Sequence, residues 1–127
     1  MGDIMQSKEL WERTCFPLRK HQKQHLPIQL DRQDRIVLYG AGYGGLMFLE
    51  LLRRQSLEPE CFLDSSPQKQ GRTIMGVPVW APGQIMVQNA TVIVCLLEMD
   101  KVFQQVRTHL AELGCQAVYH MYQLREI

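Results

Sequence analysis

The chain has 127 residues, of which 46% are hydrophobic and 21% are charged, the composition of an ordinary globular domain. Its 14 basic and 13 acidic side chains leave a formal charge of +1, which gives no strong field to attract nucleic acid or an anionic membrane surface. The longest apolar run, residues 92–97, is far too short to span a membrane, and the N-terminus lacks a secretory signal pattern. We therefore expect a single cytoplasmic domain, too short for a two-domain dehydrogenase, without nucleic acid partners and without membrane insertion by this chain.

Residues 1–33 form a polar segment with one apolar stripe. The members of the stripe are spaced three and four residues apart, which places them on one face of a helix: Leu10, Trp11, Thr14, Cys15 and Leu18. Pro17 interrupts or bends this helix because proline has no amide proton. We expect a helical N-terminal arm that packs on the core, pairs with a second copy, or belongs to a neighbouring domain.

After the arm, short apolar runs alternate with amphipathic segments. The predicted strands cover residues 36–39, 60–64, 91–97 and 115–119. The first is apolar throughout, as expected of a strand buried on both faces in a parallel sheet. Val77-Pro78-Val79 is extended but poor as a central strand, because the proline cannot donate a ladder hydrogen bond.

Two helices are predicted between these strands. Residues 46–54 have helical spacing, with Leu46, Leu49 and Leu52 facing inward. The second helix begins after a cap at Asp100 and ends at Gly114. Its apolar face comprises Val102, Phe103, Val106, Leu110 and Leu113. The segment 82–88 could add one or two helical turns.

Strands that alternate with helices predict an α/β domain. Right-handed crossovers restrict the topology, so we expect a Rossmann-like three-layer domain over residues 34–127, with a mostly parallel sheet of four to five strands. The four cysteines form no Cys-x-x-Cys pair, and three of them lie in apolar, strand-like runs. They are expected to be reduced structural thiols, and neither a metal site nor a catalytic residue is evident.

The one motif that carries chemistry is Gly40-Ala41-Gly42-Tyr43-Gly44-Gly45, which fits G-x-G-x-x-G. It follows an apolar strand and opens an amphipathic helix, and Asp64 lies nineteen positions after Gly45 at the end of the next strand. Those are the conditions of the dinucleotide-binding fingerprint. The predicted ligand-binding residues are Gly40, Ala41, Gly42, Tyr43, Gly44, Gly45, Asp64 and Ser65.

Each part of the motif has a physical role. Gly40 permits the tight turn, Gly42 lets a pyrophosphate approach the backbone, and Gly45 lets the helix lie close to the sheet. The helix N-terminus faces the phosphates with its amide protons. Asp64 would accept hydrogen bonds from ribose hydroxyls and repel a 2′-phosphate, which favours NAD over NADP, although Lys69 and Arg72 lie near enough in the sequence to soften that preference. The alternative is a glycine-rich turn that only allows close packing, with Asp64 as a turn residue.

The sequence resembles the Rossmann-like N-terminal domains of bacterial sugar-modifying enzymes in the order of five segments. These are the strand and loop 36–42, Phe62-Leu63-Asp64, Gly71, residues 76–79 and residues 91–94. These include nucleotide-sugar dehydratases and polysaccharide-biosynthesis proteins, and sugar acetyltransferases. Similar modules are attached to some methyltransferases and glycosyltransferases. The resemblance covers about residues 35–124 and implies a nucleotide, NAD or a nucleotide-sugar at the glycine loop.

Two functions therefore stay open. The first is a module that binds NAD, a nucleotide-sugar or NADP and forms part of, or acts beside, a larger sugar-modifying or group-transfer enzyme, such as a transferase, dehydratase or oxidoreductase. The second is a non-enzymatic interaction or regulatory domain that forms a homodimer and binds no nucleotide. Whether the chain itself is an enzyme is left undecided, because the chemistry would lie in an adjoining catalytic domain.

Overall fold

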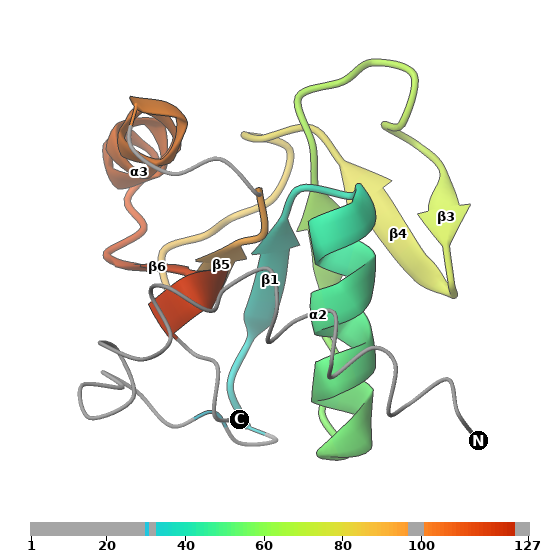
Figure 1. The fold of residues 1–127 in the computed structure, drawn as a ribbon. Coiled ribbons are helices and arrows are strands. Elements are labelled where there is room, and N and C mark those ends of the chain that lie inside the picture. The colour runs from blue at the N-terminus through green and yellow to red at the C-terminus, as the bar shows by residue number, and fades with distance from the viewer. Residues whose placement is uncertain (1–29, 31–32, 97–100, 124–127) are drawn as a thin grey trace.

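The computed structural model describes residue 30 and residues 33–96 and 101–123 (Figure 1). The apolar stripe of the predicted arm and the predicted helix cap Asp100 lie outside these residues. Among the described residues the predicted strands and helices occur in the predicted order, but no helix separates the second predicted strand from the third.

A single mixed sheet forms the middle of the molecule, in the order β3-β4-β2-β1-β5-β6. Its strands are β1 (Ile36–Tyr39), β2 (Cys61–Leu63), β3 (Thr73–Ile74), β4 (Val77–Trp80), β5 (Thr91–Val94) and β6 (Ala117–His120). Every pairing is parallel except that of the edge strand β3 with β4. The predicted fold class is confirmed, but the sheet has six strands among the described residues rather than four to five.

The additional strand comes from the hairpin of β3 and β4. Pro78 is tolerated because the parallel pairing with β2 begins after it, at Phe62 with Val79. Pro78 itself lies opposite Thr73 in the short edge strand β3. Strand β4 therefore lies next to an edge strand rather than at the centre of the sheet, as its proline indicates.

The two faces of the sheet carry two separate hydrophobic cores. In β1, Ile36 and Leu38 belong to one core, and Val37 and Tyr39 belong to the other. All four are buried, as expected for a central strand covered on both faces.

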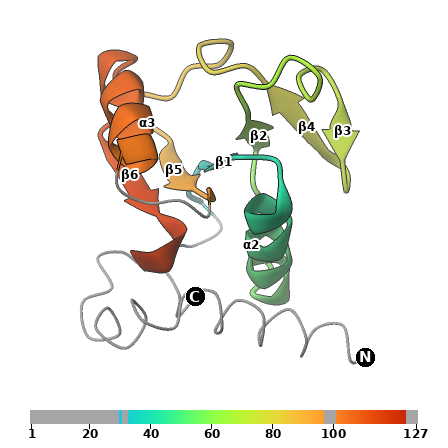
Figure 2. The same ribbon diagram turned by 45° about the horizontal axis from the view of Figure 1, so that its top comes forward.

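Helices cover both faces and complete the three layers (Figure 2). Helix α2 (Tyr43–Arg54) contributes Phe48, Leu49 and Leu52 to the first core. Helix α3 (Lys101–Glu112) contributes Phe103, Val106 and Leu110 to the second. The described chain ends in a short 3-10 helix, η2 (Met121–Gln123), which follows β6.

Three local predictions are wrong. Leu46 of α2 and Val102 of α3 were expected to face inward, but they are 38% and 36% exposed. The apolar face of each helix is narrower than the spacing of its hydrophobic residues suggests. Residues 82–88 form turns rather than a helix, because Pro82 and Gly83, with its φ of +96°, favour a tight turn.

Candidate functional site

The loops that leave β1, β2 and β5 meet at one edge of the sheet. Strand β1 lies between β2 and β5. The chain adds β2 and β4 on one side of β1 and then crosses to the other side to add β5 and β6. The Gly40 amide donates to the Leu63 carbonyl at 2.7 Å, and the Cys95 amide donates to the Tyr39 carbonyl at 2.7 Å. In open α/β sheets, ligands bind in the crevice outside the carboxyl ends of strands at such a switch point.

The glycine loop turns sharply out of β1 and leads directly into α2. Gly40 has a φ of +111°, a conformation that side chains rarely adopt. A Cβ on Gly44 would overlap the carbonyl oxygen of Cys95, and a Cβ on Gly45 would overlap that of Gly40. Both glycines are therefore required for α2 to lie against the ends of the strands.

Gly42 differs from the other glycines of the loop. Its φ of −104° and ψ of −151° are open to most residues. Of the residues that the structure describes, a Cβ at this position would meet within 4 Å only the Nζ atom of Lys69, at 3.6 Å. Within the described part of the chain, neither a positive φ nor packing requires the absence of a side chain at residue 42, so its backbone is open to close approach by another molecule.

The carboxylate of Asp64 joins the segment after β2 to the glycine loop. Its Oδ2 accepts a hydrogen bond from the Ala41 amide at 2.8 Å, and its Oδ1 accepts one from the Ser66 amide at 2.8 Å. The side chain is only 13% exposed, and the Lys69 ammonium lies 3.9 Å from Oδ2. Asp64 thus fixes the loop, which the sequence did not reveal, and forms a turn with Ser66, as the alternative interpretation anticipates.

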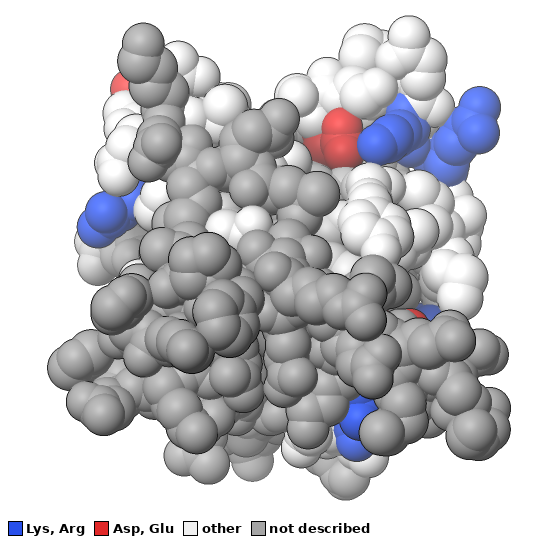
Figure 3. All heavy atoms as spheres, viewed as in Figure 1, with Lys and Arg blue, Asp and Glu red and all other residues white. Residues whose placement is uncertain are grey.

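A cleft of about 300 Å³ opens beside this carboxylate, between the strand ends and α3. In the space-filling view the upper edge of the molecule is hollowed between α3 and the segment after β2 (Figure 3). Strand ends and loops provide one wall, formed by Tyr39, Gly40, Asp64, Ser65 and Leu96. One face of α3 provides the other, formed by Val102, Gln105, Val106 and His109.

Tyr39 and Asp64 both line the cleft, and the charge of the carboxylate acts on the phenol. Burial raises the pKa of Tyr39, and the nearby negative charge of Asp64 raises it further, while a hydrogen bond with Ser65 lowers it in part. The phenol is therefore neutral at physiological pH and able to donate a hydrogen bond.

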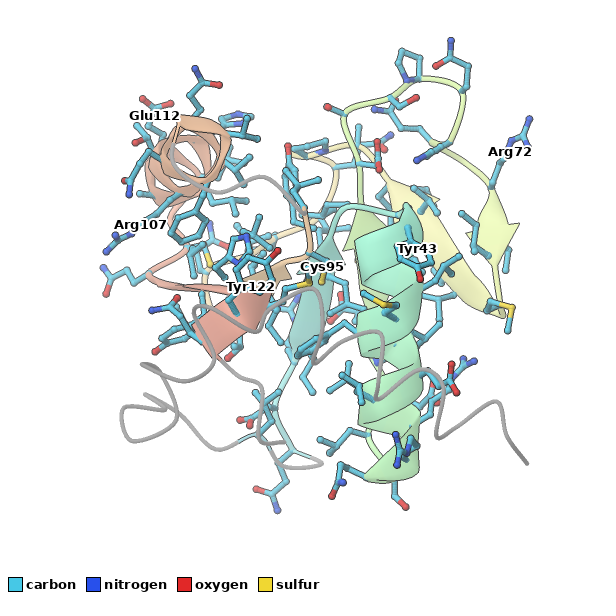
Figure 4. All side chains as sticks on the ribbon, viewed as in Figure 1. Tyr43, Arg72, Cys95, Arg107, Glu112 and Tyr122 are labelled. Carbon is cyan, nitrogen blue, oxygen red and sulfur yellow. The ribbon has the colours of Figure 1, made fainter. Side chains whose placement is uncertain are left out.

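The structure separates the eight predicted binding residues into groups. Gly40, Asp64 and Ser65 line the cleft, and Ala41 contacts Asp64 through its amide. Gly44 and Gly45 are buried, whereas Tyr43 is 54% exposed at the start of α2 (Figure 4). The polar residues of α3 were not predicted, although the spacing of positions 102, 105, 106 and 109 on one helical face is visible in the sequence.

Positive charge gathers beside Asp64. In the space-filling view, Lys and Arg side chains adjoin an acidic one on the side of the molecule where Arg72 lies (Figures 3 and 4). Arg72 points outward into solvent in the stick view, whereas the Lys69 ammonium contacts Asp64 (Figure 4). Of these two cations, Lys69 is the one placed to serve a ligand at the glycine loop.

The cysteines of the described region are built into the cores. Cys61, Cys95 and Cys115 are free and buried, as expected of structural thiols. Burial raises the pKa of the Cys61 thiol to about 12 and raises that of Cys95 further still. Within the part of the chain that the structure describes, no group of acidic, histidine and cysteine side chains is arranged to hold a metal ion. The same part contains no helix with the length and hydrophobicity needed to traverse a bilayer.

The fold is similar to one already solved in a nucleotide-sugar enzyme. The crystal structure of UDP-D-quinovosamine 4-dehydrogenase from Vibrio fischeri matches this chain with a TM-score of 0.55 at 23% sequence identity. The match covers 67% of this chain and 75% of that one. No protein-family description and no curated protein matches the sequence. The similarity therefore establishes a shared Rossmann-like fold.

Proposed function

We propose that this chain is a nucleotide-binding module that holds a nucleoside diphosphate between its glycine loop and the neighbouring cleft. The observation that carries the proposal is the open position at Gly42. Packing or a positive φ accounts for Gly40, Gly44 and Gly45, whereas neither requires a glycine at residue 42 among the described residues, and the close approach of a ligand would account for it.

The diphosphate would lie above Gly42 at the N-terminus of α2. The Leu46 amide makes the first helical hydrogen bond, to the Gly42 carbonyl, so the amides of residues 43–45 have no acceptor within the helix. No side chain in the described region caps this helix. The unpaired amides and the positive end of the helix dipole suit a phosphate group, and Lys69 adds a full positive charge beside them.

The ribose would lie in the cleft beside Asp64 and Ser65. Each carboxylate oxygen of Asp64 accepts one amide proton and keeps a second lone pair for a ribose hydroxyl. A carboxylate at this place disfavours a 2′-phosphate, so NAD is the favoured ligand. A nucleotide-sugar is the second candidate, and NADP follows because Lys69 offsets part of the negative charge.

The chemistry of this module would be binding alone. The loop amides hold the phosphates, Asp64 holds the ribose, and a larger sugar-modifying or group-transfer enzyme supplies the reacting groups. The similarity in fold to an enzyme named as a UDP-sugar 4-dehydrogenase supports this setting.

Calorimetric titration of the full chain with NAD, NADP and a UDP-sugar tests the proposal. We expect NAD to bind most tightly, and Gly42→Val to weaken its binding by at least about tenfold, because the new side chain would occupy the space of a phosphate. The backbone at residue 42 already has an extended conformation, so we expect this variant to fold, with a urea midpoint somewhat below that of the wild type because valine is a poorer helix N-cap than glycine.

Two results would count against the proposal. One is the absence of binding to all three nucleotides by the native chain. The other is equal nucleotide affinity of the native chain and a folded Gly42→Val variant, since this would place the ligand away from the loop.

A further inference from the structure

An apolar groove lies between α2 and the turn that joins β3 to β4. Its volume is about 420 Å³, and it is lined by Leu46, Leu49, Glu50, Arg53, Arg54 and Met75. Helix α2 packs on the opposite face of the sheet from α3, so this groove is separate from the candidate nucleotide cleft. Leu46 and Met75 are 38% and 65% exposed, and their side chains provide the accessible apolar surface of the groove.

The turn places Met75 in this groove despite an unfavourable backbone. Met75 and Gly76 have φ values of +52° and +83° between strands that pair Ile74 with Val77. Two positive φ values in a two-residue hairpin loop are the pattern of a type I′ turn, which favours Asn-Gly. A methionine is disfavoured at the first of these positions. We therefore attribute its presence there to the apolar side chain that it adds to the groove.

The groove is held in shape by hydrogen bonds. The Arg53 guanidinium of α2 donates to the Met75 carbonyl at 2.9 Å. The same guanidinium binds both carboxylate oxygens of Glu58, at 2.6 and 3.1 Å. The helix and the turn are therefore linked, and the groove is preformed.

We propose that the N-terminal arm of this chain docks in the groove through the apolar stripe that includes Leu10, Trp11 and Cys15. Residues 1–29 lie outside the described region, and the chain enters that region at Leu30. Leu30 is buried in the core that α2 covers, together with Leu49 and Leu52. The arm thus joins the domain on the face that carries the groove.

Length and tethering both favour this occupant. About a dozen residues separate Pro17 from Leu30, enough to span roughly 40 Å when extended. A domain of about 100 residues has a radius of gyration of only about 13 Å, so the stripe can reach the groove. A segment on a short linker has an effective concentration in the millimolar range, which populates even weak docking.

The substitution Met75→Asn tests this proposal in the full chain. Asparagine suits a type I′ turn, so the hairpin keeps its fold while the groove loses its most exposed apolar side chain. We expect chymotrypsin, which prefers the apolar residues of the stripe, to cleave the arm roughly fivefold faster in this variant, because cleavage follows the fraction of released arm. In a Trp80→Phe background, the emission of Trp11 should move to longer wavelength on the same substitution.

Met86→Asn is the matched control, because Met86 is also an exposed methionine, at 71%, and does not line the groove. We expect it to leave cleavage and emission unchanged. Equal cleavage rates in the wild type and Met75→Asn would overturn the proposal, and so would a wild-type arm that is cleaved as fast as a free peptide of residues 1–29. Protection of the arm that appears only with dimer formation would also overturn it, because the occupant would then be a second copy.

Discussion

Lys69 reaches the glycine loop from the segment that follows β2. Its Nζ atom lies 3.9 Å from Asp64 Oδ2 and 3.6 Å from the place where a Cβ on Gly42 would lie. The side chain is 41% exposed, so the ion pair with Asp64 contributes little to stability. A phosphate above Gly42 would offer the ammonium a stronger, charge-assisted partner.

We predict that Lys69→Met weakens nucleotide binding by roughly five- to tenfold while leaving the urea midpoint nearly unchanged, since it removes one charge-assisted contact. The salt dependence of the dissociation constant should also become shallower. Arg72→Met, which removes the same charge from a side chain directed into solvent, is the control and should have a much smaller effect (Figure 4). An equal loss of nucleotide affinity in the two variants would mean that binding depends only on the net charge of this surface and not on a contact with Lys69.

At the scale of elements, both helices end in the same hydrogen-bonded motif. In α3 the Gly114 amide donates to the Ala111 carbonyl at 3.0 Å, and the Cys115 amide donates to that of Leu110 at 2.9 Å. Gly114 has a φ of +95°, and the pattern is a Schellman motif. In α2 the amides after the helix bond in the same way, but the residue with positive φ, at +62°, is Ser56.

We predict that Ser56→Gly raises the free energy of unfolding by about 0.5–1 kcal/mol, because glycine adopts this conformation without steric cost. Gly114→Ala should lower it by about 1 kcal/mol or more for the opposite reason. Urea unfolding of the two variants measures both changes. A loss of stability in Ser56→Gly would show that the serine side chain contributes more than its backbone conformation costs.

The spacing of apolar residues predicted which strands and helices form better than it predicted where they begin and end. The central strand 36–39 and the helix that ends at residue 54 match the structure. The start of α2 at Tyr43 was missed because it lies among glycines, which are poor helix formers. The short strand β3 was missed because it has only two residues and depends on its partner β4.

The candidate site was predictable only where it is local in sequence. The glycine loop and Asp64 follow from a motif and a strand end. The bond of Asp64 to the Ala41 amide and the α3 wall of the cleft arise from tertiary packing, so no pattern within one segment encodes them. The position of Gly42 beside Lys69 likewise depends on how two loops meet.

At the scale of the whole molecule, buried thiols should make the fold sensitive to alkali. In the unfolded chain a cysteine ionises near its ordinary pKa of 9.0, whereas burial holds that of Cys61 at about 12. The unfolded state therefore releases more protons above pH 9, and stability falls as pH rises from 9 to about 12. The expected slope is about 1.4 kcal/mol per pH unit for each such thiol.

Urea unfolding between pH 8 and 11 checks this prediction. Cys95→Ala removes one fully buried thiol whose pKa is also raised by burial, so its stability should fall less steeply with pH than that of the wild type. The variant is expected to be less stable at pH 8, because it leaves a small cavity. Parallel curves for the two proteins would show that Cys95 is not protected from ionisation in the folded state.

In the proposed complex, the glycine loop itself contacts the diphosphate of the nucleotide. Backbone amide chemical shifts of the ¹⁵N-labelled chain, recorded during titration with NAD, test this contact. We predict that the largest shifts fall on Gly42, Tyr43 and Gly44, with a second group at Asp64 and Ser65, and that Gly42→Val removes both. A saturating titration that leaves the amides of residues 42–44 unshifted would contradict it.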